Sequence, residues 1–419
     1  MVDETLKWFC NILKQIMNVF PSPDQRLSPF EFYSTMRRLN PVVYDEAKNV
    51  WGVFRYKDVQ SILGDYVTFS SANNTFSPSL RPGLLQSDPP YHRTLRGVIA
   101  SAFTPMIVAK LEPHIDKIAN ETLDRIIEEG CMDLIDDFAY PLPVTIIAEL
   151  LGVPIKDRDL FREWADMLHY ALNSGIQRSS TEGAEIRNEH GKAKSIPRIQ
   201  EEMDSYFNAI IEKRTQAPLD DLISNLLRAQ ADGRHLSREE ILTFCRVLLV
   251  AGHVTTFNLI GNTILSLLQN PQQFKLLEEN HSLIGSTIEE TLRYRSPVQA
   301  LNRIATRDVE LGGQKIQSGQ RIIAWIGSAN HDESIFVDPE RFDITRSSRQ
   351  PNLGFGDGIH FCLGAPLARL EGQVVLRVIL QRLQGLTLDD GDSLQPLQSV
   401  FFHGVAHLPL RFQAGVHIK

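Results

Sequence analysis

A cysteine surrounded by glycines is the residue in this chain best suited to chemistry. Cys362 lies in the stretch 353–366, which reads Leu-Gly-Phe-Gly-Asp-Gly-Ile-His-Phe-Cys-Leu-Gly-Ala-Pro. Glycines let backbone N–H groups approach a sulfur closely, and the helix expected behind Cys362 favours an anion at its N-terminus. Iron held by such a thiolate suits oxygen activation. A lone cysteine is more often a small buried apolar residue, so the interpretation depends on the whole stretch.

The pattern Phe-Gly-x-Gly-x-His-x-Cys-x-Gly at 355–364 resembles the haem-binding signature of the cytochrome P450 family. The resemblance implies haem b (iron protoporphyrin IX) as the cofactor. It also implies that Cys362 supplies the axial thiolate and is the only protein ligand to the metal. The other residues of the loop that would contact the cofactor are Phe355, Gly356, His360 and Gly364.

Two further motifs follow the order and approximate spacing of this family. Glu290 and Arg293 in Glu-Thr-Leu-Arg lie one helical turn apart, so both can occupy one helix face. Arg341, in the Pro-Glu-Arg-Phe stretch 339–342, offers a guanidinium to complete a charged cluster. A Glu-x-x-Arg pair alone usually lies on a solvated helix face. In this context the resemblance implies a buried structural triad of Glu290, Arg293 and Arg341 that supports the cysteine loop and is not catalytic.

A long apolar helix is expected to cross the core. Ser-Arg-Glu-Glu at 237–240 is a capping box, and the stretch 241–268 that follows is too apolar for a surface helix. Within it, Ala-Gly-His-Val-Thr-Thr at 251–256 resembles the oxygen-binding stretch of the family, which implies catalytic roles for Ala251, Gly252 and Thr255. Glycine inside a helix costs about 1 kcal/mol relative to alanine. We therefore expect Gly252 to have a spatial reason, which in the family is room beside the iron.

The chain departs from the family pattern at Val254, because an Asp or Glu usually precedes the threonine. Positioned proton transfer typically contributes about 10²–10⁴ in rate, and valine cannot perform it. Three explanations remain open. His253 or a water chain replaces the acid, polar groups of the substrate help, or the enzyme runs slowly or on peroxide. Adjacent residues on a helix point about 100° apart, which argues against direct replacement by His253.

Haem carries two propionates, which require cations. His92 and Arg96 lie one turn apart in the stretch 88–96, which resembles the family's Asp-Pro-Pro-x-His-x-x-x-Arg. Arg303 matches a strand arginine of the family, and His360 matches the histidine two positions before the cysteine. Taken singly, each would more often be a surface charge. As a set, the resemblance implies that they contact the propionates, for which the planar fork of arginine is well suited.

The substrate pocket can be located by resemblance, but its ligand cannot be identified. Its expected segments are 71–86, the polar stretch 175–197 where the family has a mobile lid, 247–256, 298–303 and 400–405. The expected lining side chains are apolar: Phe76, Leu80, Leu84, Leu85, Val250, Val298, Leu301, Phe401 and Phe402. They fit a lipid-like, terpenoid, steroid or polyketide-derived molecule, with Gln299, Asn302 and His403 as candidate polar anchors. The aromatic residues could equally be core.

Composition indicates one large enzyme. No linker, charge block or repeat divides the 419 residues, and a net charge of −8 argues against a nucleic-acid binder. The four cysteines, Cys10, Cys131, Cys245 and Cys362, lack metal-type or disulfide-type spacing, which suits a reducing cytoplasm. We expect a mostly α protein with small β-sheets, the cytochrome P450 fold, as a single domain over 27–419. The protein is expected to be a monomer.

Residues 1–26 are expected to form a separate amphipathic segment. Apolar residues recur at helical spacing between Leu6 and Phe20, but charged residues interrupt them before Pro21. This segment is too short and too charged to be a transmembrane anchor, and it lacks the apolar core of a cleavable signal. A docking helix is the favoured interpretation, and interfacial membrane contact is the alternative.

Other elements follow from periodicity. Residues 42–54 alternate enough for a hairpin, and 106–129 carries apolar residues at helical spacing with a stop at Gly130. Further strands are expected at 309–311, 315–316 and 321–324.

The resemblance covers about 27–412 and implies a haem-thiolate monooxygenase that hydroxylates or epoxidises an apolar small molecule with O2. That stretch contains no flavin or iron–sulfur segment. Electrons are therefore expected from a separate ferredoxin and ferredoxin reductase, or from a flavodoxin-type donor. Arg93 and Arg369 are candidates to meet an acidic partner on the cysteine side.

Two other functions stay open. A peroxygenase would use the same haem with hydrogen peroxide, and turnover without reductants would identify it. A non-catalytic haem-based ligand-binding protein would shift its spectrum on binding but release no oxygenated product.

Overall fold

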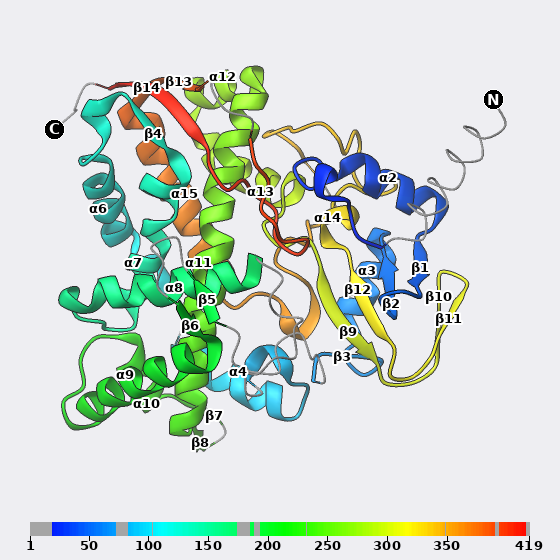
Figure 1. Cartoon of the computed structure of the whole chain (residues 1–419), viewed down its shortest axis with the longest axis horizontal. Coiled ribbons are helices and arrows are strands. Elements are labelled where there is room, and N and C mark those ends of the chain that lie inside the picture. The colour runs from blue at the N-terminus through cyan, green and yellow to red at the C-terminus, as the bar shows by residue number, and fades with distance from the viewer. Residues whose placement is uncertain are drawn as a thin grey trace.

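The structure is a computed structural model that describes residues 19–72, 83–102, 104–173, 185–187, 193–231, 233–347, 349–389 and 394–415. Helices gather on one side of the molecule, and the largest sheet lies on the other side with the N-terminal helices (Figure 1). The expected fold class, mostly α with small β-sheets, is confirmed. The described helices are α2 (Phe30–Leu39), α3 (Tyr56–Gly64), α4 (Tyr91–Ala102), α5 (Pro105–Ala109), α6 (Glu112–Leu123), α7 (Pro141–Leu150), α8 (Arg158–Asn173), α9 (Ile196–Gln216), α10 (Leu222–Arg228), α11 (Arg238–Gln269), α12 (Pro271–Glu279), α13 (Ile284–Tyr294), α14 (Ile326–Ala329) and α15 (Ala365–Arg382).

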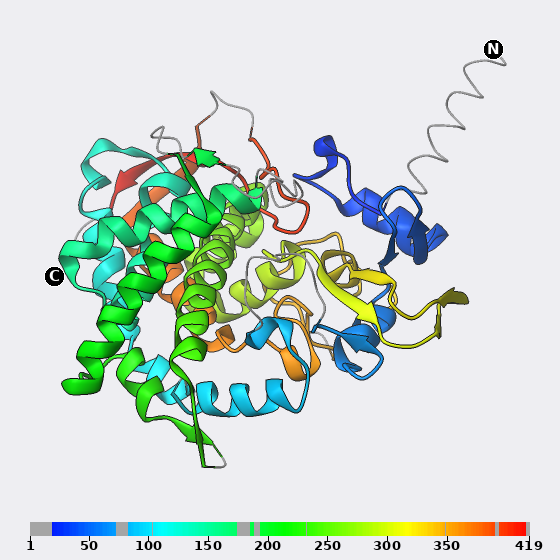
Figure 2. The ribbon, with the colours of Figure 1, turned by 60° about the horizontal axis from the view of Figure 1, so that its bottom comes forward.

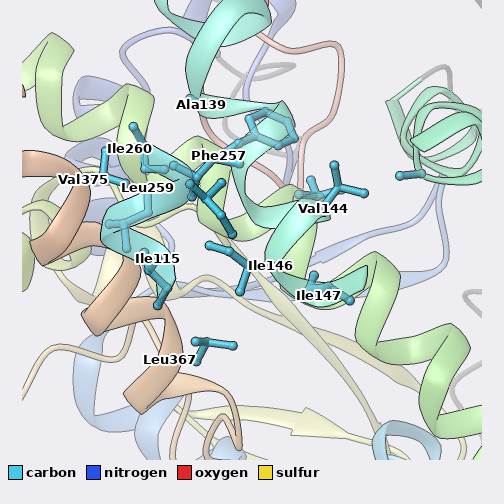
Figure 3. Packing of buried hydrophobic residues seen from close by; sticks show 14 of the residues in the cluster. Ile115, Ala139, Val144, Ile146, Ile147, Phe257, Leu259, Ile260, Leu367 and Val375 are labelled. Carbon is cyan, nitrogen blue, oxygen red and sulfur yellow. The ribbon is translucent and has the colours of Figure 1, made fainter. Parts of the chain in front are cut away.

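Helix α11 is the predicted core helix. The capping box forms as expected: Ser237 Oγ accepts from Glu240 N at 3.2 Å, and Glu240 Oε2 accepts from Ser237 N at 2.8 Å. Its middle and C-terminal parts are buried against α7, α13 and α15, and Figure 3 shows Phe257, Leu259 and Ile260 within this packing. Among the described residues, α11 is the one unbroken helix long and apolar enough to cross a membrane. The 67% burial of its most apolar window accounts for that composition through core packing.

The largest sheet has five strands in the order β1-β2-β12-β9-β3. The predicted hairpin forms from β1 (Val42–Asp45) and β2 (Val50–Val53), with Asn49 at a positive φ of 50° in its turn. Strand β12 (Arg321–Ala324) pairs parallel with β2 and antiparallel with β9 (Leu301–Ala305), which pairs with β3 (Phe69–Ser70). Two strands that follow α13 in the sequence, β9 and β12, are thus in the same sheet as the N-terminal hairpin, with β12 directly beside β2.

The remaining strands form small sheets. They are β10 (Val309–Leu311) with β11 (Gln314–Ile316), β13 (Leu383–Leu388) with β14 (Pro409–Ala414) and β4 (Cys131–Asp133), β5 (Glu185–Arg187) with β6 (Ala193–Ser195), and β7 (Gln230–Ala231) with β8 (Arg234–His235). The strands predicted at 309–311, 315–316 and 321–324 are thus present. Within the expected polar lid loop, 175–197, β5 pairs antiparallel with β6 and α9 begins at Ile196, whereas residues 175–184 and 188–192 lie outside the described ones.

The continuous helix predicted over 106–129 is wrong. The structure has α5 and α6 with a break at residues 110–111, followed by a 3-10 turn at Ile127–Glu129. Pro113 lies in the first turn of α6, where its missing N–H costs nothing, but a helix continuing through it would lose a hydrogen bond. Gly130 ends this region as expected, with a φ of 69°.

The predicted N-terminal segment lies largely outside the described residues, which begin at residue 19. Val19 is fully buried, and Phe20 packs edge-on against Trp325 with ring centroids 5.9 Å apart. A Cβ at Gly52 would lie 2.8 Å from Val19, so glycine permits this close docking. The described start of the chain is therefore anchored on the sheet.

Candidate active site

The cysteine loop connects the 3-10 turn Gly358–His360 to α15. Gly356 and Gly358 have φ values of 74° and 65°, a region that favours glycine, and Cys362 N donates to Phe355 O at 2.9 Å. Burial raises the pKa of the Cys362 thiol. The backbone N–H groups of Gly364 and Ala365 and the charge of Arg96 act in the opposite direction. These groups would stabilise a thiolate once a cation binds the sulfur.

Helix α4 lies beside this loop, and Figure 2 shows the ribbon of the molecule from this side. Arg96 donates from Nη2 to Phe361 O at 2.7 Å, so α4 is tied to the residue before the cysteine. A cavity of about 570 Å³ opens here, lined by Tyr66, Pro89, His92, Arg93, Arg96, Gly97, Ala100, Gly358 and Ile359.

Three of the four predicted propionate contacts, His92, Arg303 and His360, form a buried cluster of basic side chains. The rings of His92 and His360 lie 4.3 Å apart, and both Nε2 atoms are buried without a hydrogen-bond partner among the described residues. Burial, followed by the charge of Arg303, lowers the pKa of His360 to about 3. Burial also lowers the pKa of Arg303 to about 10, with Asp88 opposing the shift. The cluster disfavours its own positive charge and would be stabilised by a bound anion. Two carboxylates of a cofactor fit this requirement.

Part of α11 borders open space. Ala251 is exposed and Thr255 is partly exposed, although most of the helix that carries them is buried. Thr255 Oγ1 donates to Ala251 O at 2.6 Å, as expected for a threonine that bonds the carbonyl one turn earlier. This stretch can therefore receive a ligand.

Gly252 lies where α7 packs on α11. A Cβ at this position would lie 2.8 Å from Ile147 Cδ1, so the missing side chain contributes to this packing. Figure 3 shows Ile147 on this packed face. The expected room beside the cofactor stays a prediction.

His253 does not occupy the position of the missing acid. Its Nε2 lies 3.0 Å from Tyr140 O, its ring packs edge-on against Tyr140, and its side chain is 1% exposed. Val254 is also buried. The hypothesis that His253 delivers protons to Thr255 is therefore contradicted by the direction of its side chain.

The predicted structural triad has a different third member. Arg293 forms a two-pronged pair with Glu290, with Nε–Oε2 and Nη2–Oε1 distances of 2.8 Å, and both side chains are buried. Arg346 completes the cluster, with Nε 3.0 and 3.1 Å from the two carboxylate oxygens. Arg341 is instead 62% exposed and pairs with Asp343 at 3.4 Å. Its contribution is its backbone oxygen, which accepts from Arg293 and Arg346.

Asn330 connects this triad to the cysteine loop and was missed in the sequence. Arg293 Nη1 donates to Asn330 O at 3.0 Å, and Asn330 Oδ1 accepts from Leu353 N at 2.7 Å. A Cβ at Gly354 would lie 2.9 Å from Leu292 O, so the start of the loop rests on α13. No spacing rule marks Asn330, because its role depends on segments distant in sequence.

The predicted pocket side chains differ in burial. Leu84 is buried and Leu85 is 48% exposed, and five others are partly buried: Val250, Val298, Leu301, Phe401 and Phe402. Leu301 Cδ1 lies 3.7 Å from the position of a Cβ on Gly356, so β9 reaches the cysteine loop. Phe76 and Leu80 fall outside the described residues.

Gln299 and His403, expected as candidate polar anchors, are engaged with other protein groups. Gln299 accepts from Tyr33 Oη and donates to Ser296 O, both at 2.6 Å. His403 Nε2 lies 3.2 Å from Leu27 O, and burial together with the Arg295 charge lowers the pKa of His403 to about 3. Both side chains are buried in the scaffold, so they do not face a ligand.

Arg369, a candidate for contact with a redox partner, is also engaged. Its guanidinium binds Glu289 at 2.5 Å and lies over the Phe355 ring at 4.6 Å. It therefore braces the cysteine loop from α15.

Comparisons with known proteins agree with this arrangement. The family model for "Cytochrome P450" matches residues 41–414. The chain is 41% identical over 396 residues to cytochrome P450 109 of Bacillus spizizenii, covering 94% of each chain. It is 39% identical to the erythromycin C-12 hydroxylase of Saccharopolyspora erythraea, covering 91% of this chain and 93% of that protein.

Solved structures show the same similarity. CYP109E1 from Bacillus megaterium in complex with testosterone superposes with a TM-score of 0.81 at 39% identity, covering 92% of this chain and 99% of that one. The ligand-free cytochrome P450 TbtJ1 gives a TM-score of 0.84 at 40% identity, covering 94% and 99%.

Proposed function

Because this chain belongs to the cytochrome P450 family and is a haem-thiolate monooxygenase, we propose that it hydroxylates or epoxidises an apolar small molecule at a site built around Cys362 and Thr255. The observation that carries this assignment is the pairing of a glycine-framed cysteine with buried nitrogens on His92 and His360 that have no hydrogen-bond partner in the described part of the chain.

Haem b with a cysteine axial ligand is the family's cofactor. We assign the axial thiolate to Cys362, the loop contacts to Phe355, Gly356 and Gly364, and the propionate contacts to His92, Arg96, Arg303 and His360. When bound, haem supplies the activation of O2 and the transfer of one oxygen atom to the substrate. Gly364 and Ala365 then hold the sulfur as a thiolate, and Arg96 keeps α4 on the loop.

The roles of the α11 residues follow from their positions. Ala251 and Thr255 border the open space and are proposed to contact substrate and oxygen, with the Thr255 hydroxyl handling protons. Gly252 is proposed to act indirectly, by setting the distance between α11 and α7. Since His253 points away, protons are proposed to reach Thr255 through water or a polar group of the substrate.

An apolar substrate of steroid or polyketide type is favoured by two observations. The partly buried side chains of the proposed pocket, Val250, Val298, Leu301, Phe401 and Phe402, are hydrocarbon, and relatives include a protein named erythromycin C-12 hydroxylase and a structure in complex with testosterone. Electrons are proposed to come from a ferredoxin and its reductase, or from a flavodoxin-type donor. We propose that the protein is a cytoplasmic monomer with a single catalytic domain over 27–419.

A substrate screen by haem difference spectroscopy tests this proposal. Testosterone and an erythromycin-type macrolide are the first probes, and compounds that shift the spectrum should yield oxygenated products with surrogate ferredoxin and reductase. Ligands that shift the spectrum but yield no product under any electron supply would favour the non-catalytic ligand-binding protein.

The proposed route of protons to Thr255 predicts how two substitutions in α11 change the product formed per reductant oxidised. Thr255→Ala should lower product formed per reductant oxidised severalfold, because the hydroxyl facing the open space is lost. Val254→Glu should leave this coupling unchanged or reduce it, since Val254 is 1% exposed and a carboxylate there carries a desolvation cost. Haem content is measured first in both variants. Improved coupling in Val254→Glu would mean that the missing acid limits the wild-type enzyme, and normal coupling in Thr255→Ala would refute the role of this hydroxyl.

A further inference from the structure

A buried asparagine on α11 fastens the turn that carries two of the proposed pocket aromatics. Asn262 is fully buried, and its Nδ2 donates to Arg295 O at 3.0 Å and to His403 O at 2.8 Å. A side-chain amide has two N–H donors, so both are used, one on each of two segments distant in sequence. Asn262 therefore joins α11, the end of α13 and the turn at 399–404.

The same turn is held from its other side by backbone hydrogen bonds. Gln299 N donates to Phe401 O at 2.8 Å, His403 N donates to Pro297 O at 2.9 Å, and Val298 forms an isolated bridge with Phe402. Figure 1 shows the segment that precedes β14, in red, running down past α11 and α13. Val298, Phe401 and Phe402 thus lie in two segments that are joined by backbone hydrogen bonds.

Close contact between the turn and α11 extends beyond Asn262. A Cβ at Gly404 would lie 2.0 Å from Asn258 Oδ1, so the turn can approach the helix this closely only with glycine there. Asn258 and Asn262 lie one turn apart on α11. Asn262 lies seven residues after Thr255, about 10 Å along the axis and on nearly the same face.

From this geometry we infer that Asn262 is a positioning residue for the substrate pocket. It fixes the turn at 399–404 to the helix that carries Thr255, and thereby sets how far Phe401 and Phe402 stand from the reacting centre. The inference rests on the proposed function in that it takes these aromatics as pocket wall. Asn262 itself touches neither cofactor nor substrate.

The test compares a small and a bulky haem ligand. Imidazole needs space only at the metal, whereas 4-phenylimidazole also needs space at the pocket wall. Asn262→Leu removes both hydrogen bonds and leaves two buried carbonyls without this donor. It should change the ratio of the two dissociation constants by about fivefold or more, with the imidazole value within about twofold of wild type. Thr263→Val is the matched control, because the Thr263 hydroxyl bonds only Leu259 O within the same buried helix among the described contacts.

Gly404→Ala provides an independent second variant. It pushes the turn away from Asn258 without altering Asn262, so it should change the same ratio. If Asn262→Leu does not incorporate haem, the ratio of the two dissociation constants is measured in Gly404→Ala and in Asn262→Ser, which keeps one donor. An unchanged ratio in haem-loaded variants, or an equal change for both ligands, would overturn the inference. If the reduced carbonyl complex of the wild-type protein lacks the thiolate-type spectrum, the proposed function itself is refuted.

Discussion

Glu290→Ala is expected to yield little haem-loaded protein, because the buried guanidinium of Arg293 and the partly buried guanidinium of Arg346 lose their shared carboxylate. Arg293 and Arg346 both bind Glu290 at 2.8–3.1 Å, and the Glu290 and Arg293 side chains are no more than 4% exposed. Removing one partner of a buried ion pair typically costs about 3–5 kcal/mol, which is a large fraction of the roughly 5–15 kcal/mol by which a folded protein is stable. Thermal unfolding and haem content per chain measure the loss.

The two arginines near this cluster provide a matched comparison. Arg346→Ala should destabilise the protein strongly, since its Nε binds Glu290 and its other nitrogens bind Val337 O, Asp338 O and Arg341 O. Arg341→Ala should cost no more than about 1 kcal/mol, because that side chain is largely exposed and forms only a surface pair with Asp343. Equal losses in the two variants, or normal stability in Glu290→Ala, would show that the triad is assigned wrongly.

Cys362→His is expected to abolish the thiolate-type spectrum of the reduced carbonyl complex and to abolish monooxygenation. An imidazole cannot donate electron density to the metal as a thiolate does. The hydrogen-bonding backbone of Gly364 and Ala365 is also positioned for a sulfur at this place. The reduced carbonyl spectrum of the purified variant gives the readout.

Cys131→Ser serves as the control for this variant. Cys131 is an exposed free thiol on β4, away from the cysteine loop in sequence and in fold, so its replacement should change neither spectrum nor turnover. A thiolate-type spectrum that survives in Cys362→His would mean that another residue binds the metal.

The cysteine loop and the core helix could be predicted because their signals are local. Positive φ at Gly356 and Gly358, the capping box at Ser237 and Glu240, and the apolar length of α11 all depend on residues close in sequence. The pairing of β12 with β2 of the N-terminal hairpin, and of β9 with β12, could not be predicted from such local signals. It depends on contacts between segments far apart in the chain.

The errors within the site share one cause, which is side-chain direction. Arg341 and Arg346 are five residues apart, and only the folded backbone decides that Arg346 turns inward to Glu290. His253 faces Tyr140, although it lies in a stretch that resembles a catalytic motif.

The interpretation of Gln299 and His403 as polar pocket anchors was wrong for the same reason. Gln299 and His403 lie in segments that line the proposed pocket, yet both side chains turn into the scaffold and bind Tyr33 and Leu27. The sequence identifies the segments of such a site more reliably than the residues that face its ligand.

The most direct test of the central claim is the source of the oxygen atom in the product. A compound that shifts the haem spectrum is converted under isotopically labelled O2 with surrogate ferredoxin and reductase, and the product mass is measured. A monooxygenase incorporates one labelled atom per product, and formation stops without reductant. Unlabelled product, or product that forms at the same rate from hydrogen peroxide without any reductant, would contradict the account and identify a peroxygenase.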